Sequence, residues 1–425
     1  MRSPIPDYLT DALRSVAADT SGATADYIPE LAQADPDRLA AALCTVDGHV
    51  YSAGDADVEF SIQSISKPFV YALALADRGF DEVLSKVWVE PSGDSFNQIS
   101  LEPESGRPRN PMINAGALVA TSLSGPPGAG ADQRFERIVD GLSAFAGRRL
   151  EVDEAVYESE LHHAYRNRAL ANMLRAHDII AEDPLVAVAG YTRQCSLLVT
   201  TDDLAVMAAT LANRGVNPVT GRPVVSAPVV RQVLSVMSTC GMYDGAGDWM
   251  TRVGVPAKSG VSGGLIGALP GQAGIATFSP RLDRHGNSVR GVDLFQRFTA
   301  DMGMHLMDVP GTAREAIADR YVDGDGPDAI EVIELQGDLR FAAAEHVVRE
   351  FEVRPPVTSS ILLDLARIGT IDDVGRRMLL EAVRRLTIDG HEVFVLDPDQ
   401  VLPDPDPGTG GRITVVDDRG QVRQR

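Results

Sequence analysis

The chain has 425 residues, of which 44% are hydrophobic and 23% are charged, and its formal net charge at pH 7 is -21. This length exceeds what a single hydrophobic core usually organises, so two domains are expected. The acidic balance argues against binding to nucleic acid or to an anionic membrane. The segment from Met1 to Asp7 has no apolar run typical of a signal peptide, and no stretch approaches the ~20 apolar residues of a membrane span. These features predict a cytoplasmic protein.

The cysteines and histidines show no pattern of a metal site. Cys44, Cys195 and Cys240 are far apart and form no CxxC pair, which favours small, buried, reduced side chains. The histidines have no paired spacing with carboxylates, and no glycine-rich phosphate loop follows a strand. The sequence therefore predicts neither a metal nor a cofactor.

In chain order, the first segment with chemical information is Phe60–Leu75, whose second half is apolar, rich in Ala and Leu, and typical of a buried helix. Pro68 fixes the start of this helix, because proline is tolerated only in the first turn. Ser64 and Lys67 are therefore expected at the helix amino terminus, three residues apart and on one face.

This placement suits an activated serine. The free amides and the positive end of the helix dipole favour negative charge that develops there. A lysine desolvated against an apolar helix can have its pKa lowered enough to accept the proton of the serine. Ser-x-x-Lys also occurs often by chance, so a helix-capping serine followed by an unrelated lysine stays open as an alternative.

A second element, Val255–Gly264, contains Lys258-Ser259-Gly260 in a strand-like context. It resembles the Lys-Thr/Ser-Gly element of serine β-lactamases and penicillin-binding proteins. Its glycines let the backbone approach a ligand closely. The amide of Val261 would then pair with the amide of Ser64 as an oxyanion hole.

An acidic run rich in Gly and Pro, from Val322 to Asp328, predicts a linker. Strands and helices alternate after it. The predicted elements are, in order, the strand Ala329–Leu335, the helix Phe341–Phe351, the strand Ser360–Ile368, the helix Gly375–Leu386 and the strand Val393–Leu396. This order implies a small α/β layer domain.

Five blocks in the first region, taken together, resemble the serine-dependent glutaminases of the β-lactamase-like fold. They are Ala25–Ala32, Gln63–Pro68, Asn110–Ala117, Cys240–Asp244 and Pro256–Gly264. The resemblance extends from Tyr8 to about Val309. It implies hydrolysis of the side-chain amide of free L-glutamine to L-glutamate and ammonia, with Ser64 as the acyl-forming nucleophile and Lys67 as its base.

The resemblance also implies the remaining site residues. Tyr243 joins Ser64 and Lys67 in the catalytic set. The implied substrate-binding residues are Tyr27, Ser64, Asn114, Glu160, Asn167, Tyr191, Tyr243 and Val261. Glu160 would pair with the α-ammonium of glutamine, while amide and phenol donors would hold the α-carboxylate. Such a site is expected to reject peptide-bound glutamine, which has no free ammonium.

The segment Ser359–Leu386 resembles the STAS domain, the fold of bacterial anti-anti-sigma factors and sulfate-transporter tails. Ile361–Leu365 and Ile371–Gly375 carry the resemblance. In the regulatory members a serine or threonine at the start of the following helix is phosphorylated, whereas Asp373 stands there in this chain. This replacement favours a constitutive docking or oligomer contact over a phosphorylation switch. A passive α/β appendage is the alternative.

Together these patterns predict an α/β multi-domain chain. Residues 1–320 would form a β-lactamase/transpeptidase-like domain with a mixed sheet and a helical subdomain, and residues 328–416 a small α/β STAS-like domain. We expect L-glutamine as the small-molecule substrate, a homo-oligomer, and a protein partner through the STAS-like domain. Two alternatives stay open, a β-lactamase or peptidase-type serine acyl hydrolase and a glutamine-sensing signalling adaptor without catalysis.

Overall fold

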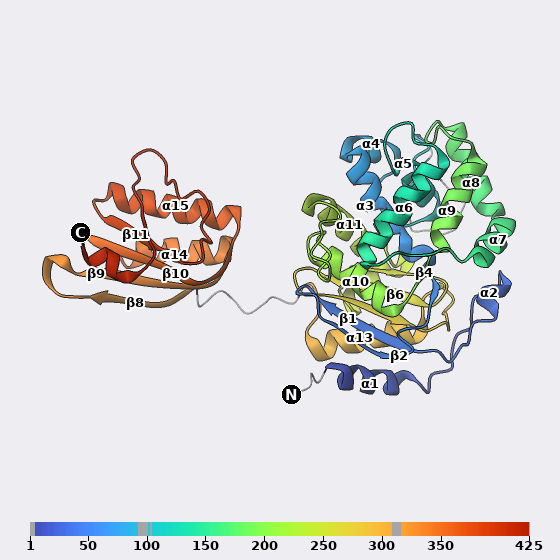
Figure 1. The fold of residues 1–425 in the computed structure, drawn as a ribbon, viewed down its shortest axis with the longest axis horizontal. Coiled ribbons are helices and arrows are strands. Elements are labelled where there is room, and N and C mark those ends of the chain that lie inside the picture. The colour runs from blue at the N-terminus through green and yellow to red at the C-terminus, as the bar shows by residue number, and fades with distance from the viewer. Residues whose placement is uncertain (1–4, 92–100, 103, 308–315, 425) are drawn as a thin grey trace. The chain divides into compact units, whose positions relative to one another are not determined.

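The computed structural model describes residues 5–91, 101–102, 104–307 and 316–424, and it divides the chain into two compact units, Met1–Asp308 and Val309–Arg425 (Figure 1). Each unit has its own five-stranded sheet. The division therefore lies earlier than the sequence predicts. Residue 320 falls inside strand β8 (Ile317–Asp323), which pairs with a strand of the second unit.

The sheet of the first unit is antiparallel, with the strand order β2-β1-β7-β6-β5. Its strands are β1 (Ala40–Thr45), β2 (Val50–Gly54), β5 (Ala257–Ser259), β6 (Gly264–Leu269) and β7 (Ala273–Phe278). Side chains alternate between its faces, since Ala40 and Ala42 belong to the core on one side and Ala41 and Leu43 to the core on the other. Both faces of the sheet are thus buried.

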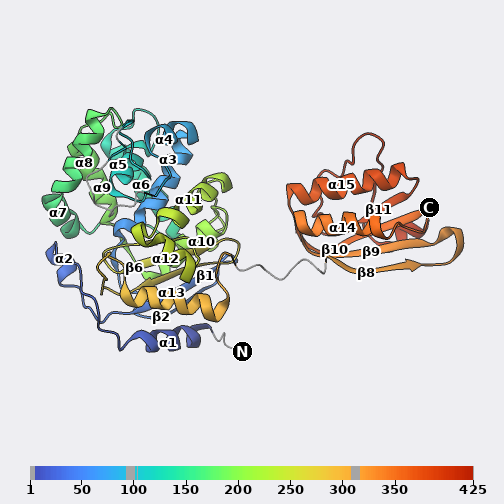
Figure 2. The ribbon, with the colours of Figure 1, turned by 180° about the vertical axis from the view of Figure 1, so that it is seen from behind.

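Helices cover both faces of this sheet. Helices α1 (Ile5–Val16) and α13 (Val289–Met302) lie on one face, and α10 (Thr201–Ala212) lies on the other, in both views of Figures 1 and 2. The close approach of α10 requires glycine at position 274 of β7, because a Cβ atom there would lie 2.0 Å from the backbone nitrogen of Ala209.

A helical subdomain lies beyond α10 on the same side of the sheet (Figures 1 and 2). Its helices are α3 (Ser66–Arg78), α4 (Phe80–Lys86), α5 (Asn114–Leu123), α6 (Ala131–Ala146), α7 (Glu154–His163), α8 (Tyr165–Ala176), α9 (Pro184–Cys195) and α11 (Ala227–Cys240). Every residue of α3 from Ser66 to Leu75 is buried, so the predicted buried helix is confirmed. Pro68 lies in its first turn, where the missing N–H leaves no hydrogen bond unmade.

The sheet of the second unit has the strand order β12-β11-β10-β9-β8. Its other strands are β9 (Ile330–Leu339), β10 (Ser360–Ile371), β11 (Glu392–Leu396) and β12 (Thr414–Val416). Strand β8 is antiparallel to β9, and all other neighbours are parallel. Helices α14 (Phe341–Val353) and α15 (Asp373–Ile388) pack on one face, and Val422 of the last 3-10 turn packs against the other.

The three strands and two helices predicted for the second unit are all present. Strands β8 and β12, at the two edges of the sheet, are not among the predicted elements. The run from Val322 to Asp328 is the turn between β8 and β9 rather than a linker between domains. None of the helices in the described part of the chain is both long and apolar enough to cross a membrane.

Candidate active site

Ser64 and Lys67 lie where the sequence predicts, at the beginning of α3. Ser64 is in a 3-10 turn, Gln63–Ile65, that leads directly into the helix, and Lys67 is the second residue of the helix. Gln63 has a positive φ of 50°, a left-handed conformation that non-glycine residues adopt rarely. Backbone strain of this kind gathers at functional sites, and here it directly precedes the serine.

Lys67 is 1% exposed, and no carboxylate of the described residues lies within 4.0 Å of it. Burial lowers the pKa of its ammonium to about 7. Its Nζ donates a hydrogen bond of 2.7 Å to Oδ1 of Asn114. A large fraction of Lys67 is therefore an unprotonated amine at neutral pH, the form that can accept a proton.

Asn114 connects three side chains of the site. It is the first residue of α5, and a turn held by Asn110, whose Oδ1 accepts from two backbone amides, brings it there. Its Oδ1 also accepts a hydrogen bond of 3.3 Å from Tyr191, and its Nδ2 donates one of 3.1 Å to Oδ1 of Asn167. Gly116 allows this tight turn, because a Cβ atom there would lie 2.0 Å from the carbonyl oxygen of Asn110.

Tyr243 lies in a second 3-10 turn, Tyr243–Gly245. It too has a positive φ, of 54°. Burial raises the pKa of its phenol well above the usual range, and a hydrogen bond with Ser64 acts in the opposite direction. Lys258 on β5 donates a hydrogen bond of 2.8 Å to its oxygen. The phenol of Tyr243 is thus paired with a second buried amine, that of Lys258.

Glu160 on α7 supplies the negative end of the site. Tyr27 donates a hydrogen bond of 2.7 Å to Oε1 of Glu160, and Nε2 of Gln63 donates one of 3.2 Å to the same oxygen. Burial raises the pKa of this carboxyl group, although the two hydrogen bonds partly oppose that effect. A bound cation would offset the cost of desolvating this carboxylate, so the geometry fits an ammonium group.

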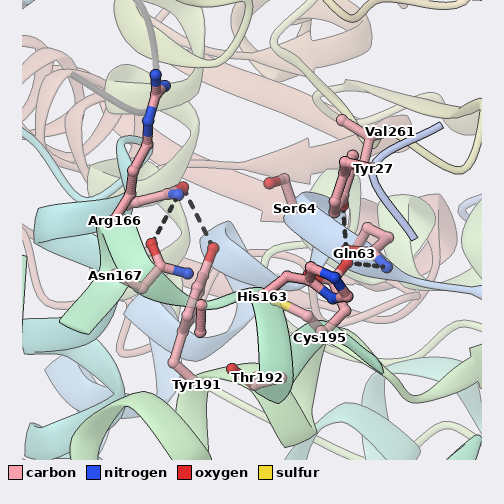
Figure 3. A pocket seen from close by; sticks show the side chains of 13 residues that line it. Tyr27, Gln63, Ser64, His163, Arg166, Asn167, Tyr191, Thr192, Cys195 and Val261 are labelled. Atoms are coloured by element: carbon pink, nitrogen blue, oxygen red, sulfur yellow. Dashed lines mark hydrogen bonds between the residues drawn. The ribbon is translucent and has the colours of Figure 1, made fainter. Parts of the chain in front are cut away.

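These residues surround one cavity of about 360 Å³. All the predicted substrate-binding residues line it except Tyr243. In Figure 3, Ser64 projects between Tyr27 and Val261 on one side and Asn167 and Tyr191 on the other. The cavity therefore joins the nucleophile, the carboxylate and a set of amide and phenol groups in a single space.

Some lining residues are absent from the sequence prediction. They are Gln63, His163, Ala164, Arg166, Thr192 and Cys195. Helical spacing could have indicated two of them, since His163 lies one turn from Glu160 and Cys195 lies one turn from Tyr191. Burial raises the pKa of the Cys195 thiol to about 11, so it is protonated at neutral pH and is not a competing nucleophile.

A metal site is not evident in the part of the chain that the structure describes, since no three His, Cys, Asp or Glu side chains there are arranged to hold an ion. The lining of the cavity offers a serine, a carboxylate, amides and two phenols, and the buried amine of Lys67 lies three residues along the chain from the serine.

Comparisons with known proteins identify the family of the chain. The family model described as Glutaminase matches residues 22–307. The chain belongs to the glutaminase family. The glutaminase of Corynebacterium glutamicum is 51% identical over 94% of this chain and 96% of its own length, and that of Corynebacterium efficiens is 47% identical over 98% and 97%. The expectation of an enzyme of this family is confirmed.

Solved structures also share the fold. A crystal structure of Mglu superposes with a TM-score of 0.88 and 50% identity over 95% of this chain and 100% of that one. A probable glutaminase of Bacillus subtilis matches with a TM-score of 0.65 and 34% identity over 71% of this chain and 98% of that one. Mglu in its L-glutamate binding form matches with a TM-score of 0.87 and 45% identity over 95% of this chain and 100% of that one.

Proposed function

We propose that this glutaminase-family chain hydrolyses the side-chain amide of free L-glutamine through an acyl-enzyme on Ser64. The observation that carries the proposal is that Ser64 and Glu160 open on the same cavity of about 360 Å³. A serine beside a buried amine of low pKa is a nucleophile for an amide, and a carboxylate in the same space selects a substrate that carries a cation.

The reaction divides into two steps. In acylation, Lys67 takes the proton of Ser64 while Oγ attacks the side-chain carbonyl carbon, and the backbone amides of Ser64 and Val261 stabilise the oxyanion. The Lys67 ammonium then returns the proton to the departing nitrogen, and ammonia leaves. In deacylation, water attacks the ester, its proton passes through Lys67 to Oγ of Ser64, and L-glutamate is released.

Recognition of the free amino acid uses the two ends of the cavity. Glu160, held by Tyr27 and Gln63, pairs with the α-ammonium of the substrate. Asn114 and Asn167, which lie beside Tyr191, hold the α-carboxylate. An analogue that lacks the α-ammonium or the α-carboxylate would leave these buried polar groups without partners. The site therefore rejects such an analogue. The L-glutamate binding form of Mglu supports a pocket for the reaction product.

A substrate panel tests the proposal. Ammonia release from L-glutamine, L-asparagine and N-acetyl-L-glutamine is compared with the opening of a penicillin by the same protein sample. We expect ammonia from L-glutamine and at least roughly 10-fold lower kcat/KM for the acetylated compound, because the acetyl group removes the ammonium. Efficient penicillin hydrolysis would favour the β-lactamase-type alternative. A folded protein that binds L-glutamine but releases no ammonia would be a sensor instead.

We propose further that the second unit is a STAS-like module, that the protein acts in the cytoplasm, and that the chain forms a homo-oligomer. The alternating parallel strands and helices from β9 to β11 support the first point. Asp373, the first residue of α15, supplies a permanent negative charge where regulatory relatives of that fold carry a phosphorylated residue. The mass of the full chain in solution, measured by light scattering, tests the oligomer, and a monomer would contradict it.

A further inference from the structure

His163 lines the cavity near Glu160, and the reaction scheme above does not use it. The two residues are three positions apart on α7, so they are neighbours on one face of that helix. Figure 3 shows the imidazole ring of His163 at the end of the cavity where Tyr27 and Gln63 lie, the two residues that donate hydrogen bonds to Glu160. An α-ammonium bound by Glu160 would therefore lie close to this ring.

The hydrogen bond of one ring nitrogen of His163 determines what the other nitrogen can do. Nδ1 lies 2.8 Å from the carbonyl oxygen of Ser159. A carbonyl oxygen only accepts, so Nδ1 carries the hydrogen, and in the neutral ring Nε2 has a free lone pair. Among the residues that the structure describes, Nε2 has no hydrogen-bond partner. The neutral imidazole thus presents an unused acceptor at the cavity.

Two carboxylates surround this ring and favour a cation beside it. One is Glu160 itself. The other is Glu30 on α2 (Pro29–Ala32), which accepts a hydrogen bond of 2.8 Å from Oγ of Ser159, the residue that also holds the ring of His163. Burial raises the pKa of Glu160, and a positive charge on His163 acts on that pKa in the opposite direction. The charge state of His163 therefore affects the group that is proposed to bind the substrate.

Protonation reverses what the ring of His163 offers to an ammonium group. The imidazolium has a hydrogen on Nε2 in place of the lone pair, and its positive charge repels a second cation. Two other groups at this end can carry positive charge. They are His162, whose ring centroid lies 4.9 Å from that of His163, and Arg166, which lines the cavity from α8. Histidine is the side chain that changes charge between about pH 5 and pH 8, so acidification is expected to weaken binding here.

We propose that Nε2 of neutral His163 is a second acceptor for the α-ammonium of L-glutamine, and that protonation of this ring weakens substrate binding. The proposal rests on the proposed function, since it deepens the recognition assigned there to Glu160. It gives His163 a role in binding, whereas Lys67 keeps the proton transfer. The two roles can be separated, because binding can be measured without turnover.

Binding of L-glutamine to the Ser64→Ala protein, measured by calorimetry, tests this role. His163→Asn has no atom at the place of Nε2, whereas His163→Gln is long enough to put an uncharged acceptor there. At about pH 8, His163→Asn is expected to raise the Kd roughly 5-fold and His163→Gln less than about 2-fold. Between about pH 8 and pH 5.5, the Kd of the protein with His163 should rise at least roughly 5-fold more than that of the His163→Gln protein.

His162→Gln is the matched control. His162 is the exposed neighbour of His163 on the same helix and does not line the cavity, so this variant should keep the pH dependence of the protein with both histidines. Circular dichroism checks the fold of each variant. If the heat of binding is too small to measure, the same comparison is made on KM for ammonia release in the background with Ser64.

Three outcomes decide the matter. Equal pH dependence in the His163→Gln and His162→Gln proteins would overturn the effect of protonation. An unchanged Kd for His163→Asn at about pH 8 would overturn the role of Nε2 as an acceptor. Absence of ammonia release from L-glutamine by the unmodified chain would instead overturn the proposed function, whatever the variants of His163 bind.

Discussion

Two buried lysines of the first unit contrast with two buried carboxylates of the second unit. In the second unit, Glu331 forms an ion pair of 2.6 Å with Arg320, and Asp364 accepts a hydrogen bond of 3.2 Å from Arg419. In the first unit, Lys67 and Lys258 are fully buried, and the oxygen atoms they contact belong to an amide, a phenol and a backbone carbonyl.

The difference indicates which unit carries chemistry. A buried carboxylate beside a guanidinium has a partner that compensates its charge. A buried amine without a counterion has a lowered pKa, and it can therefore accept and return protons near neutral pH. We infer that catalysis belongs to the first unit and that the second unit acts through its surface.

The largest expected effect comes from Ser64→Ala. Removing the nucleophile is expected to lower kcat for L-glutamine by roughly 10⁴-fold or more, because no acyl-enzyme can form. Ammonia release measures the loss, and circular dichroism checks that the fold is kept. Ser85→Ala, at an exposed position outside the cavity, is the matched control. Near-normal turnover by a folded Ser64→Ala protein would refute the assignment of the nucleophile.

The next largest effect is expected from Glu160→Gln. It keeps the shape of the side chain but replaces a charge-assisted hydrogen bond to the substrate with a neutral one, at a cost of about 2 kcal/mol, or roughly 30-fold in kcat/KM. Steady-state kinetics with L-glutamine measure the change. Glu158→Gln, an exposed position on the same helix, should leave kcat/KM unaltered. An unchanged value for Glu160→Gln would show that the carboxylate only faces solvent.

The pH dependence is expected to follow Lys67. Its pKa of about 7 means that the ammonium form dominates at lower pH, and this form cannot accept the proton of Ser64. Below that value kcat/KM should fall about tenfold per pH unit, and above it the rate should level off. Protonation of Glu160, whose pKa is raised, would steepen the acid limb. A profile that stays flat between pH 5 and pH 9 would exclude Lys67 as the base.

The smallest effect is expected from removal of the second unit. A chain that ends at Met307 keeps the whole first sheet and every residue of the cavity, so its kcat/KM should stay within about 2-fold of the full chain. Its mass in solution should change if the second unit makes the oligomer contact. A soluble, folded truncation without activity would show that the second unit contributes to the active site, and the contrast between the units would then fail.

The start of the catalytic helix could be predicted from the sequence because a covalent constraint fixes it. Proline at position 68 leaves the helix only one place to begin, and that place sets the relation of Ser64 to Lys67. The three central strands and both helices of the second unit could also be predicted, since buried runs such as Ile361-Leu362-Leu363 are typical of core strands.

Other features could not be read from the sequence. Strand β8 is a partly exposed edge strand, and its stability comes from backbone hydrogen bonds to β9, which leave no pattern in its side chains. Its acidic, glycine-rich end therefore resembled a linker. The pairing of Lys258 with Tyr243, and the position of Asn114 between Lys67 and Asn167, arise only when distant segments fold together.

Each five-stranded sheet takes all its strands from one unit. A recombination event near residue 308 could therefore have joined two independent genes without cutting either sheet. Substitutions that disturb the strand pairing of one sheet would then leave the backbone hydrogen bonds of the other sheet intact.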